Sequence, residues 1–415
     1  MPRLSIDWSA SLLLDRPIPS MIVNDLRQML GRNSSARAWP HLLPPQARIA
    51  RGLLLRRPIF AILRPTARCN LGCTYCKVPA ATRGAELEVK ILQEIMLRLR
   101  SLGVAILNIG GGEPTLRSDI EQIVAAATPH FTTRMQTNGV GLSEDRVRGI
   151  VKAGLQGVSV SLDTLNRDRF DDLCAVEGSW EGAVRTMLAF GRHMPRRGPL
   201  LIMNVVVSRM NHRELPVLAR FAAALGFRAA FVPMLSAADA DAEKTSYFRR
   251  SVPHLLPAGE ERMALKKAYA QVIAEAKAGL PIANSLQFLD DCIRYVDVGK
   301  RGWTCEAGAL FVVVARDGKV GLCSEIPPED NILEDEAFEE LRSGRWARER
   351  EDAVLNCPDC MHPCFSEVSL LRHDPRVFFG KVRTEMQLRV RPRPEPPTYD
   401  EAVALARKLS AEVAS

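Results

Sequence analysis

The sequence lacks any apolar run long enough to cross a membrane. Stretches such as LIMNVVV and GALFVVVA are far shorter than the ~20 residues that a bilayer-spanning helix needs. A secretory signal is also missing, because Asp7 and Asp15 interrupt the apolar N-terminal stretch and no small-residue cleavage site follows. These absences predict a cytoplasmic protein.

Lysine and glutamate are missing from the first 57 residues, which makes this segment strongly basic. It holds nine Arg and three Asp, a net charge of +6 out of +8 for the whole chain. Two helices are predicted within it, over 19–31 and 45–57, and the second is basic and amphipathic. Such a helix either packs on the domain or contacts an anionic membrane surface or substrate. No aromatic residues interleave with the arginines of this second helix, so nucleic acid is not an expected partner.

The ten cysteines lack the distribution of a disulfide scaffold. Three lie within 69–76 and three within 357–364, and two more shortly precede the second group. Clusters of this kind in a large cytosolic chain favour metal or iron–sulfur ligation over disulfides. The isolated Cys174 and Cys292 are interpreted as small buried hydrophobic residues.

Short apolar runs alternate with helical patterns over the first half of the chain. The predicted strands cover 58–65, 104–110, 131–137, 157–163, 200–207 and 227–233, and the predicted helices between them cover 86–103, 117–127, 143–154, 179–193 and 212–226. This alternation predicts an α/β fold with a parallel sheet and right-handed crossovers. Ligands are then expected at the carboxyl ends of the strands.

The alternation stops after Pro233, and the chain of 415 residues is too long for one ordinary core. It is predicted to divide into a basic extension (1–57), a core barrel (58–235), a helical linker (236–300), a second cysteine domain (301–370) and a tail (371–415). The linker holds one amphipathic helix over 260–280, after a polar loop over 236–248. Within 301–370 the main helical pattern is EAFEELRSG. The tail has a semi-rigid proline-rich linker over 391–397 and a last helix that Thr398 and Glu401 open as a capping box.

The first cysteine group, Cys69, Cys73 and Cys76, directly follows the first predicted strand. Later strands end in GGGEP, TNG and SLDT, so four strand ends are expected to meet at one site. Three thiolates hold three corners of a cubane cluster, whereas an ordinary electron carrier uses a fourth. The missing ligand leaves one iron open to bind a substrate or cofactor. The alternative for this loop is a zinc site.

These motifs resemble those of the radical S-adenosylmethionine (SAM) enzymes. The resemblance covers roughly 58–235 and rests on the cysteine spacing with Tyr75 before the last cysteine, together with GGEP, TNG and SLD at later strand ends. It implies a partial (β/α)6 TIM-like barrel in which the open iron binds SAM through its amino and carboxylate groups. One electron then cleaves a carbon–sulfur bond and yields a 5'-deoxyadenosyl radical.

The resemblance also implies a set of cofactor contacts. The residues carried over are Tyr75, Gly111, Gly112, Glu113, Pro114, Thr137, Asn138, Ser161, Asp163 and Asn204. Glycines 110–112 leave room for the methionine part of SAM, and Glu113 can accept a hydrogen bond from its ammonium group. Ser161 and Asp163 lie two apart on a predicted strand, so both face one side and could reach a ribose hydroxyl. Each of these residues also has an ordinary turn, capping or loop role as its alternative.

The second cysteine group begins with Cys305, twelve residues, Gly318, four residues and Cys323. The apolar runs on either side of RDGK predict a β-hairpin with the two cysteines near its ends. This element resembles the C-terminal auxiliary-cluster modules called SPASM and twitch, and the cysteine count fits the single-cluster twitch form, a small α+β domain. A zinc knuckle is the alternative.

The run NCPDCMHPC supplies Cys357, Cys360 and Cys364. Five cysteines then compete for the four corners of a second 4Fe–4S cluster. The adjacent pair Cys357 and Cys360, with Pro358 stiffening the turn, is expected to join Cys305 and Cys323. Cys364 is a spare fourth ligand, a radical-quenching thiol and thus a candidate catalytic residue, or a buried thiol.

The sequence therefore predicts a radical SAM enzyme that abstracts a hydrogen atom from a small-molecule or lipid-like substrate, with dehydrogenation, epimerisation or rearrangement as the outcome. The alternative is a peptide-modifying maturase of the SPASM class, and an alternative from another class is a non-enzymatic iron–sulfur redox or sensor protein. A flavodoxin or ferredoxin is the expected electron donor.

Overall fold

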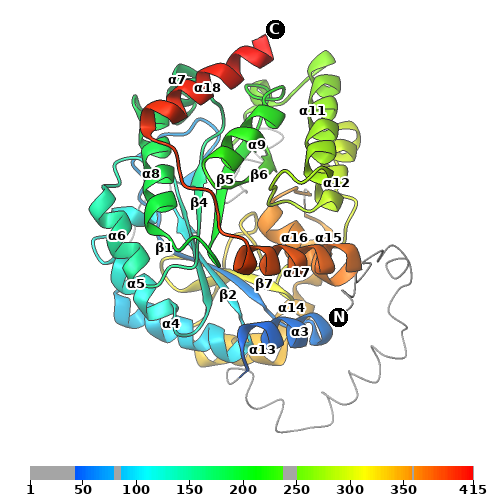
Figure 1. The fold of residues 1–415 in the computed structure, drawn as a ribbon. Coiled ribbons are helices and arrows are strands. Elements are labelled where there is room, and N and C mark those ends of the chain that lie inside the picture. The colour runs from blue at the N-terminus through cyan, green and yellow to red at the C-terminus, as the bar shows by residue number, and fades with distance from the viewer. Residues whose placement is uncertain (1–42, 79–85, 237–249, 358, 415) are drawn as a thin grey trace, which may run out of the picture.

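The structure, a computed structural model, describes residues 43–78, 86–236, 250–357 and 359–414. Six parallel strands are present: β1 (Phe60–Thr66), β2 (Ile106–Gly111), β3 (Thr132–Thr137), β4 (Gly157–Ser161), β5 (Leu200–Val207) and β6 (Arg228–Pro233). They lie in sequence order across the sheet, and the strands at its two edges do not pair with each other. The predicted α/β class with an open, partial barrel is confirmed (Figure 1).

The crossover helices cover one face of this sheet. They are α4 (Val89–Leu102), α5 (Ile120–Ala127), α6 (Glu144–Lys152), α7 (Arg167–Cys174), α8 (Ser179–His193) and α9 (Leu215–Ala224). Five were predicted from their apolar periodicity; α7 was not, because its eight residues RDRFDDLC are mostly charged. Ser143 and Asn166 cap α6 and α7 by accepting a hydrogen bond from the third following N–H.

β3 and β5 alternate between a buried face under the helices and a half-buried, concave face. In β3 and β5 every second side chain is buried, and the side chains between them are only half-buried. The half-buried positions include Arg134 and Gln136 on β3 and Asn204 on β5. This period of two places polar groups in the barrel lumen, where a ligand can reach them.

The predicted hairpin is present as β7 (Phe311–Val314) and β8 (Lys319–Gly321), followed by β9 (Asp330–Asn331). β7 pairs in parallel with β1, with Phe60 opposite Phe311 and Leu63 opposite Val314. Gly318 has a φ of 84° in the turn, a value that glycine adopts without strain. The hairpin therefore extends the barrel sheet, so the predicted core and the predicted second cysteine domain share one nine-stranded sheet.

The C-terminal half is more helical than the sequence indicated. The predicted helices over 260–280 and within EAFEELRSG are α11 (Glu260–Lys277) and α13 (Asp335–Ser343), while α12 (Leu286–Val298), α14 (Arg345–Glu349), α15 (Glu351–Leu355), α16 (Pro363–His373) and α17 (Pro375–Val390) were missed. α16 contacts both β6 and α3 (Pro45–Leu55). Its Phe365 ring stacks on Phe311 of β7, with centroids 4.8 Å apart. α16 therefore spans the side that the open barrel leaves uncovered (Figure 1).

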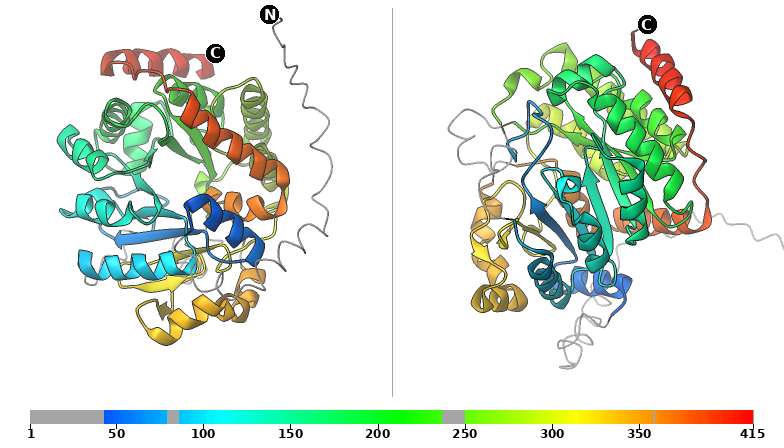
Figure 2. Two further views of the ribbon diagram at one scale, coloured as in Figure 1. Left: turned by 60° about the horizontal axis from the view of Figure 1, so that its bottom comes forward. Right: turned by 90° about the vertical axis from the view of Figure 1, so that its left-hand side faces the viewer.

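The tail is bound to the barrel. Arg393 is buried and donates hydrogen bonds to the carbonyls of Met194 and Pro195, at 3.1 and 2.9 Å. The stretch predicted as a linker is thus anchored on the core. The predicted capping box is confirmed: Thr398 N–H donates to Glu401 Oε2 (2.8 Å), and Glu401 N–H donates to Thr398 Oγ1 (3.3 Å), at the start of α18 (Tyr399–Ala414). In both views of Figure 2, α18 lies at the opposite end of the molecule from α13 and α14.

The basic helix α3 packs on the core. Arg48 is 4% exposed and donates hydrogen bonds to the carbonyls of Val104 and His130. Arg56 forms an ion pair with the buried Glu306 at 3.0 Å. These contacts favour the domain-packed alternative over a membrane contact for this helix. The other predicted N-terminal helix (19–31) and the predicted polar loop (236–248, except for its first residue) lie outside the described residues.

In the part of the chain that the structure describes, every helix is too short or too polar to span a bilayer.

We predict that Arg48→Gln lowers the free energy of unfolding by about 1–3 kcal/mol, because the buried Val104 carbonyl and the part-buried His130 carbonyl lose their donor. The measurement is a urea unfolding curve, with the exposed Arg148→Gln as the control. If α3 bound a membrane instead of the core, Arg48→Gln would bind anionic vesicles less well than the wild type and would have the same free energy of unfolding.

Candidate active site and cysteine pocket

The end of β2 holds the first cysteine loop through close backbone contacts. The Gly112 N–H donates to the Thr66 carbonyl oxygen at 3.0 Å. A Cβ atom on Gly111 would lie 2.4 Å from that oxygen, and one on Gly112 would lie 2.2 Å from the Arg68 carbonyl oxygen. The direct reason for glycine here is therefore the approach of the cysteine loop. Room for the methionine part of SAM stays a prediction.

The end of α7 holds the other side of the loop. The N–H groups of Gly72 and Thr74 donate to carbonyl oxygens at the end of α7, each at 3.0 Å. The Cys174 thiol donates a hydrogen bond to Cys73 and thereby lowers the pKa of Cys73. Cys174 is buried, as the sequence predicts, and it also supports a neighbouring thiol.

Glu113 joins the ends of β2 and β3. Pro114 begins a short 3₁₀ turn, and Glu113 Oε1 accepts hydrogen bonds from the N–H (3.0 Å) and hydroxyl (2.6 Å) of Thr115 and from the Thr137 hydroxyl (2.8 Å). Its Oε2 accepts one from the Asn138 N–H at 2.6 Å. Burial raises the pKa of Glu113. Because Oε1 already accepts three hydrogen bonds, the predicted hydrogen bond from the SAM ammonium group can form only at Oε2.

Asn138, in the TNG segment after β3, reaches back to the cysteine loop. Its Nδ2 donates to Asn70 Oδ1 at 2.8 Å and lies 3.7 Å from the Cys69 sulfur. Its Oδ1 accepts a hydrogen bond from the Val140 N–H at 2.8 Å. Asn138 therefore fixes the loop beside one of the thiols, whether or not it also contacts the cofactor.

Tyr75 and Asp163 come together from opposite sides of the site. The Tyr75 hydroxyl donates to Asp163 Oδ2 at 2.7 Å, and the Val206 N–H donates to Oδ1 at 2.8 Å. Burial raises the pKa of Asp163 to about 6. The strand predicted over 157–163 ends at Ser161, so Ser161 and Asp163 do not alternate along one strand. Ser161 lies beside Asn204 in the register of β4 and β5 instead.

The three loop thiols fit an iron–sulfur cluster, for which thiolates are the usual ligands. Burial raises the pKa of Cys69 and raises that of Cys76 to about 11, so cluster binding must displace protons. Among the described residues, no three His, Cys, Asp or Glu side chains converge tightly enough for a single metal ion.

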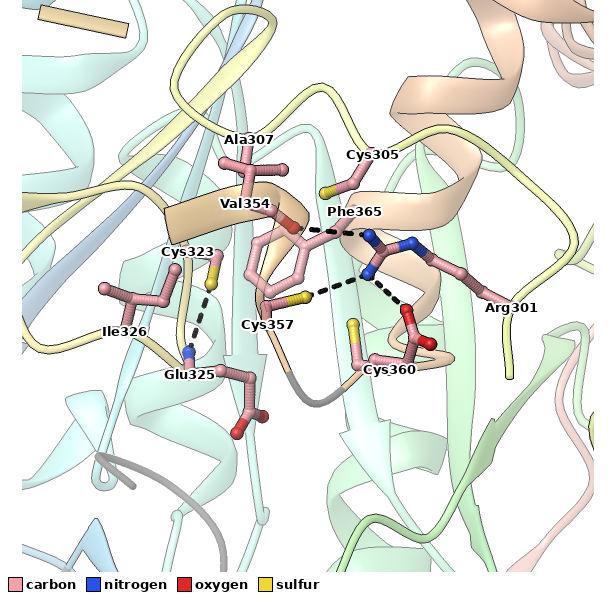
Figure 3. A pocket seen from close by; sticks show the side chains of 11 residues that line it. Arg301, Cys305, Ala307, Cys323, Glu325, Ile326, Val354, Cys357, Cys360 and Phe365 are labelled. Atoms are coloured by element: carbon pink, nitrogen blue, oxygen red, sulfur yellow. Dashed lines mark hydrogen bonds and ion pairs between the residues drawn. The ribbon is translucent and has the colours of Figure 1, made fainter. Parts of the chain in front are cut away.

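Four cysteines of the second group line one pocket, with their sulfurs turned toward its centre (Figure 3). They are Cys305, Cys323, Cys357 and Cys360. Apolar residues (Ala307, Ile326, Val354 and Phe365) share the lining with the charged Arg301, Glu325 and Asp359. Four convergent thiols fit a closed 4Fe–4S site. Pro358, predicted to stiffen the turn, lies outside the described residues.

Most of the pocket sulfurs accept hydrogen bonds from the backbone. Cys305, Cys323 and Cys360 each accept one from the N–H two residues further along the chain. Burial raises the pKa of Cys305 to about 12 and that of Cys323 to about 11. Cys357 accepts a hydrogen bond from the side chain of Arg301 at 2.9 Å.

Cys364 is not among the residues that line this pocket, which favours the predicted ligand set in which it is the spare thiol. It sits in the first turn of α16 and accepts a hydrogen bond from Gln136 Nε2 of β3 at 3.8 Å. Burial raises its pKa to about 11. Its thiol therefore faces the barrel lumen, below the TNG segment.

Sequence reasoning missed a contact between the two sites. Arg64 on β1 is buried and donates to the Ser324 hydroxyl at 2.6 Å. Ser324 follows Cys323, while the Arg64 backbone lies 3.5 Å from where a Cβ of Gly111 would be. The available signal for Arg64 was a charged residue within the apolar strand β1. For Arg134 and Gln136 it was their position on either side of Met135 in β3.

We predict that Glu113→Gln lowers the free energy of unfolding of the cofactor-free chain by about 1–3 kcal/mol, because the new amide cannot accept every hydrogen bond that the carboxylate accepts. Urea unfolding measures this, with the exposed Glu94→Gln as the control. Normal stability together with weaker SAM binding would instead assign Glu113 to the cofactor alone.

We predict that Cys360→Ala loses about half of the iron of the reconstituted chain, because a second cluster loses one of its four ligands. Cys364→Ala is the matched variant and should keep its iron. Iron analysis and Mössbauer spectra give the answer, and the reverse pattern would contradict the ligand set.

The chain has known relatives in sequence and in fold. Residues 63–222 match the Radical SAM superfamily. The chain is 30% identical over 174 residues to a PqqA peptide cyclase from Methylocella silvestris, covering 41% of this chain but only 46% of that relative. It is 28% identical over 271 residues to the PqqA peptide cyclase of Ruegeria pomeroyi, covering 64% of this chain and 67% of the relative.

Among solved structures, SuiB from Streptococcus suis has a similar fold. In its complex with the precursor peptide SuiA, the TM-score is 0.53 at 17% identity, covering 72% of this chain and 67% of SuiB. In its complex with SAM, the TM-score is 0.55 at 17% identity, covering 79% and 77%. The superfamily match identifies residues 63–222 as a Radical SAM domain, a kind of domain that uses SAM and a 4Fe–4S cluster, and the likeness to SuiB shows a shared fold.

Proposed function

We propose that this enzyme modifies a peptide, starting with hydrogen-atom abstraction from an unactivated C–H bond. The observation that carries the proposal is the similarity over 271 residues to a PqqA peptide cyclase. The fold likeness to SuiB in complex with a precursor peptide is in keeping with it. The peptide alternative therefore replaces the small-molecule or lipid-like substrate that the sequence alone favoured.

Cys69, Cys73 and Cys76 would hold the first cluster, on a loop whose position the ends of β2 and α7 fix. When bound, this cluster and SAM supply the 5'-deoxyadenosyl radical. Glu113 keeps the ends of β2 and β3 together, and Asn138 steadies the loop beside Cys69. These contacts fix the positions of the reacting groups. Such positioning is the main contribution of a protein when a cofactor performs the chemistry.

The concave face of the sheet is the proposed peptide site. Its half-buried positions carry hydroxyl, amide and guanidinium groups, which can pair with the backbone and polar side chains of a peptide. They include Arg134, Gln136, Ser159, Ser161 and Asn204. Cys364 opens onto the same lumen, so a catalytic role for its thiol remains a prediction.

The four thiols of the second pocket would hold the auxiliary cluster with every corner occupied by protein. A fully ligated cluster has no open iron for the substrate, which suits electron transfer. A flavodoxin or ferredoxin as the electron donor remains a prediction. A membrane-surface contact also remains a prediction, and the packing of α3 on the core argues against it.

We predict that Cys69→Ala, Cys73→Ala or Cys76→Ala abolishes SAM cleavage, because two thiolates cannot anchor the first cluster. Formation of 5'-deoxyadenosine under anaerobic reducing conditions is the measurement. Cys292→Ala, which removes a buried thiol outside both sites, should keep the activity. Cleavage that persists in a loop variant would remove the role proposed for these cysteines.

The substrate class is tested by adding short synthetic peptides encoded beside this chain's gene to one anaerobic reaction and a peptide-free small-molecule extract to another. We expect 5'-deoxyadenosine to increase with a peptide, together with a change in the peptide's mass. An increase with the small-molecule extract alone would refute the peptide proposal and leave SAM cleavage intact.

A further inference from the structure

Arg301 is held against the pocket of the second cluster by contacts on several sides. Its Nη1 donates to the Cys357 sulfur at 2.9 Å and forms an ion pair with Asp359 Oδ1 at 2.7 Å. Its Nη2 donates to the Val354 carbonyl at 3.4 Å. The guanidinium lies 5.5 Å from the ring centre of Trp303. The side chain is 13% exposed, so its position is defined and largely shielded from water.

Arg301 differs in kind from the other donors to these sulfurs. Cys305, Cys323 and Cys360 accept hydrogen bonds from backbone N–H groups, which carry no net charge. Cys357 accepts one from a full positive charge. Hydrogen bonds with an ionised donor are roughly twice as strong as neutral ones, and a low local dielectric strengthens them further.

The expected electrostatic effect has a definite sign. Adding an electron makes a cluster and its thiolates more negative, so a cation at hydrogen-bond distance stabilises the reduced state more than the oxidised one. Hydrogen bonds to the sulfurs and net charge are among the factors that set the potential of an iron–sulfur cluster. Asp359 acts in the opposite direction, and its ion pair with Arg301 makes the two charges compensate in part.

We propose that Arg301 is a positioning residue that raises the reduction potential of the auxiliary cluster through its contact with Cys357, and that Asp359 limits this increase. A higher potential favours accepting an electron over donating one. The inference concerns the cluster alone and holds for any substrate, so it stands or falls independently of the peptide proposal.

The test is an EPR-monitored redox titration of the reconstituted full-length chain. Cys69, Cys73 and Cys76 are replaced by Ala in every sample, so only the auxiliary cluster contributes a signal. Iron content is matched before the potentials are compared. Arg148→Gln, an exposed arginine on α6, is the charge-matched control.

Arg301→Gln should shift the potential to more negative values, because the cation is lost and the Asp359 carboxylate is left uncompensated. Asp359→Asn should shift it to more positive values, and Asn tolerates the positive φ of 56° at this position. Arg301→Lys keeps the charge without the planar fork and should fall between wild type and Arg301→Gln. The control should titrate like the wild type.

Equal potentials for wild type and Arg301→Gln would overturn the proposal. Shifts of the same sign in Arg301→Gln and Asp359→Asn would also overturn it, because a general disturbance of the pocket does not change sign with the charge removed. If Arg301→Gln fails to retain its cluster, Asp359→Asn decides, and the absence of a positive shift there refutes the idea.

Discussion

The two cysteine sites depend on one strand, β1, and on its pairing in parallel with a neighbour on each side. All seven of its residues are buried, with β2 on one side and β7 on the other. Its carboxyl end leads into the first cysteine loop, and β7 carries the hairpin that precedes Cys323. Because Phe60 to Leu63 pair with Phe311 to Val314, a change in this register would move the two sites relative to each other. The distance between the two cysteine sites is thus set by backbone hydrogen bonds within one sheet.

Side chains reinforce this backbone coupling at two points. Arg64 of β1 donates to Ser324, next to Cys323. Glu306, next to Cys305 and 2% exposed, is paired with Arg56, Arg372 and His373 at 3.0, 3.2 and 2.8 Å. A buried carboxylate needs such partners, since an uncompensated buried charge is strongly unfavourable. Loss of these partners would leave the Glu306 carboxylate buried without compensation. The network therefore holds α3, α16 and the segment before β7 in one arrangement.

Local patterns in the sequence were sufficient for the sheet but not for what covers its open side. The six parallel strands and the hairpin follow from apolar runs bounded by turn residues, and these signals are local. α16 was missed because its buried face includes Ser366 and Ser369, which look polar in a sequence. Their hydroxyls donate to the carbonyls of His362 and Phe365, four residues back, so each can be buried without an unmet hydrogen bond. α17 was missed because apolar residues such as Phe379 and Met386 are exposed on it, which weakens the helical periodicity.

The candidate site shows a different limit of sequence analysis. A motif identifies which residues are present but not which groups they form hydrogen bonds with. GGEP, TNG and SLD were assigned to the cofactor by resemblance, yet Gly112, Glu113 and Asn138 make contacts that hold the strand ends and the cysteine loop together. Asp163 likewise binds Tyr75 and the Val206 N–H. These partners lie far apart along the chain, so no local pattern could reveal them. A residue in such a motif can be required because it shapes the cofactor site, even where its own hydrogen bonds are made to neighbouring protein groups.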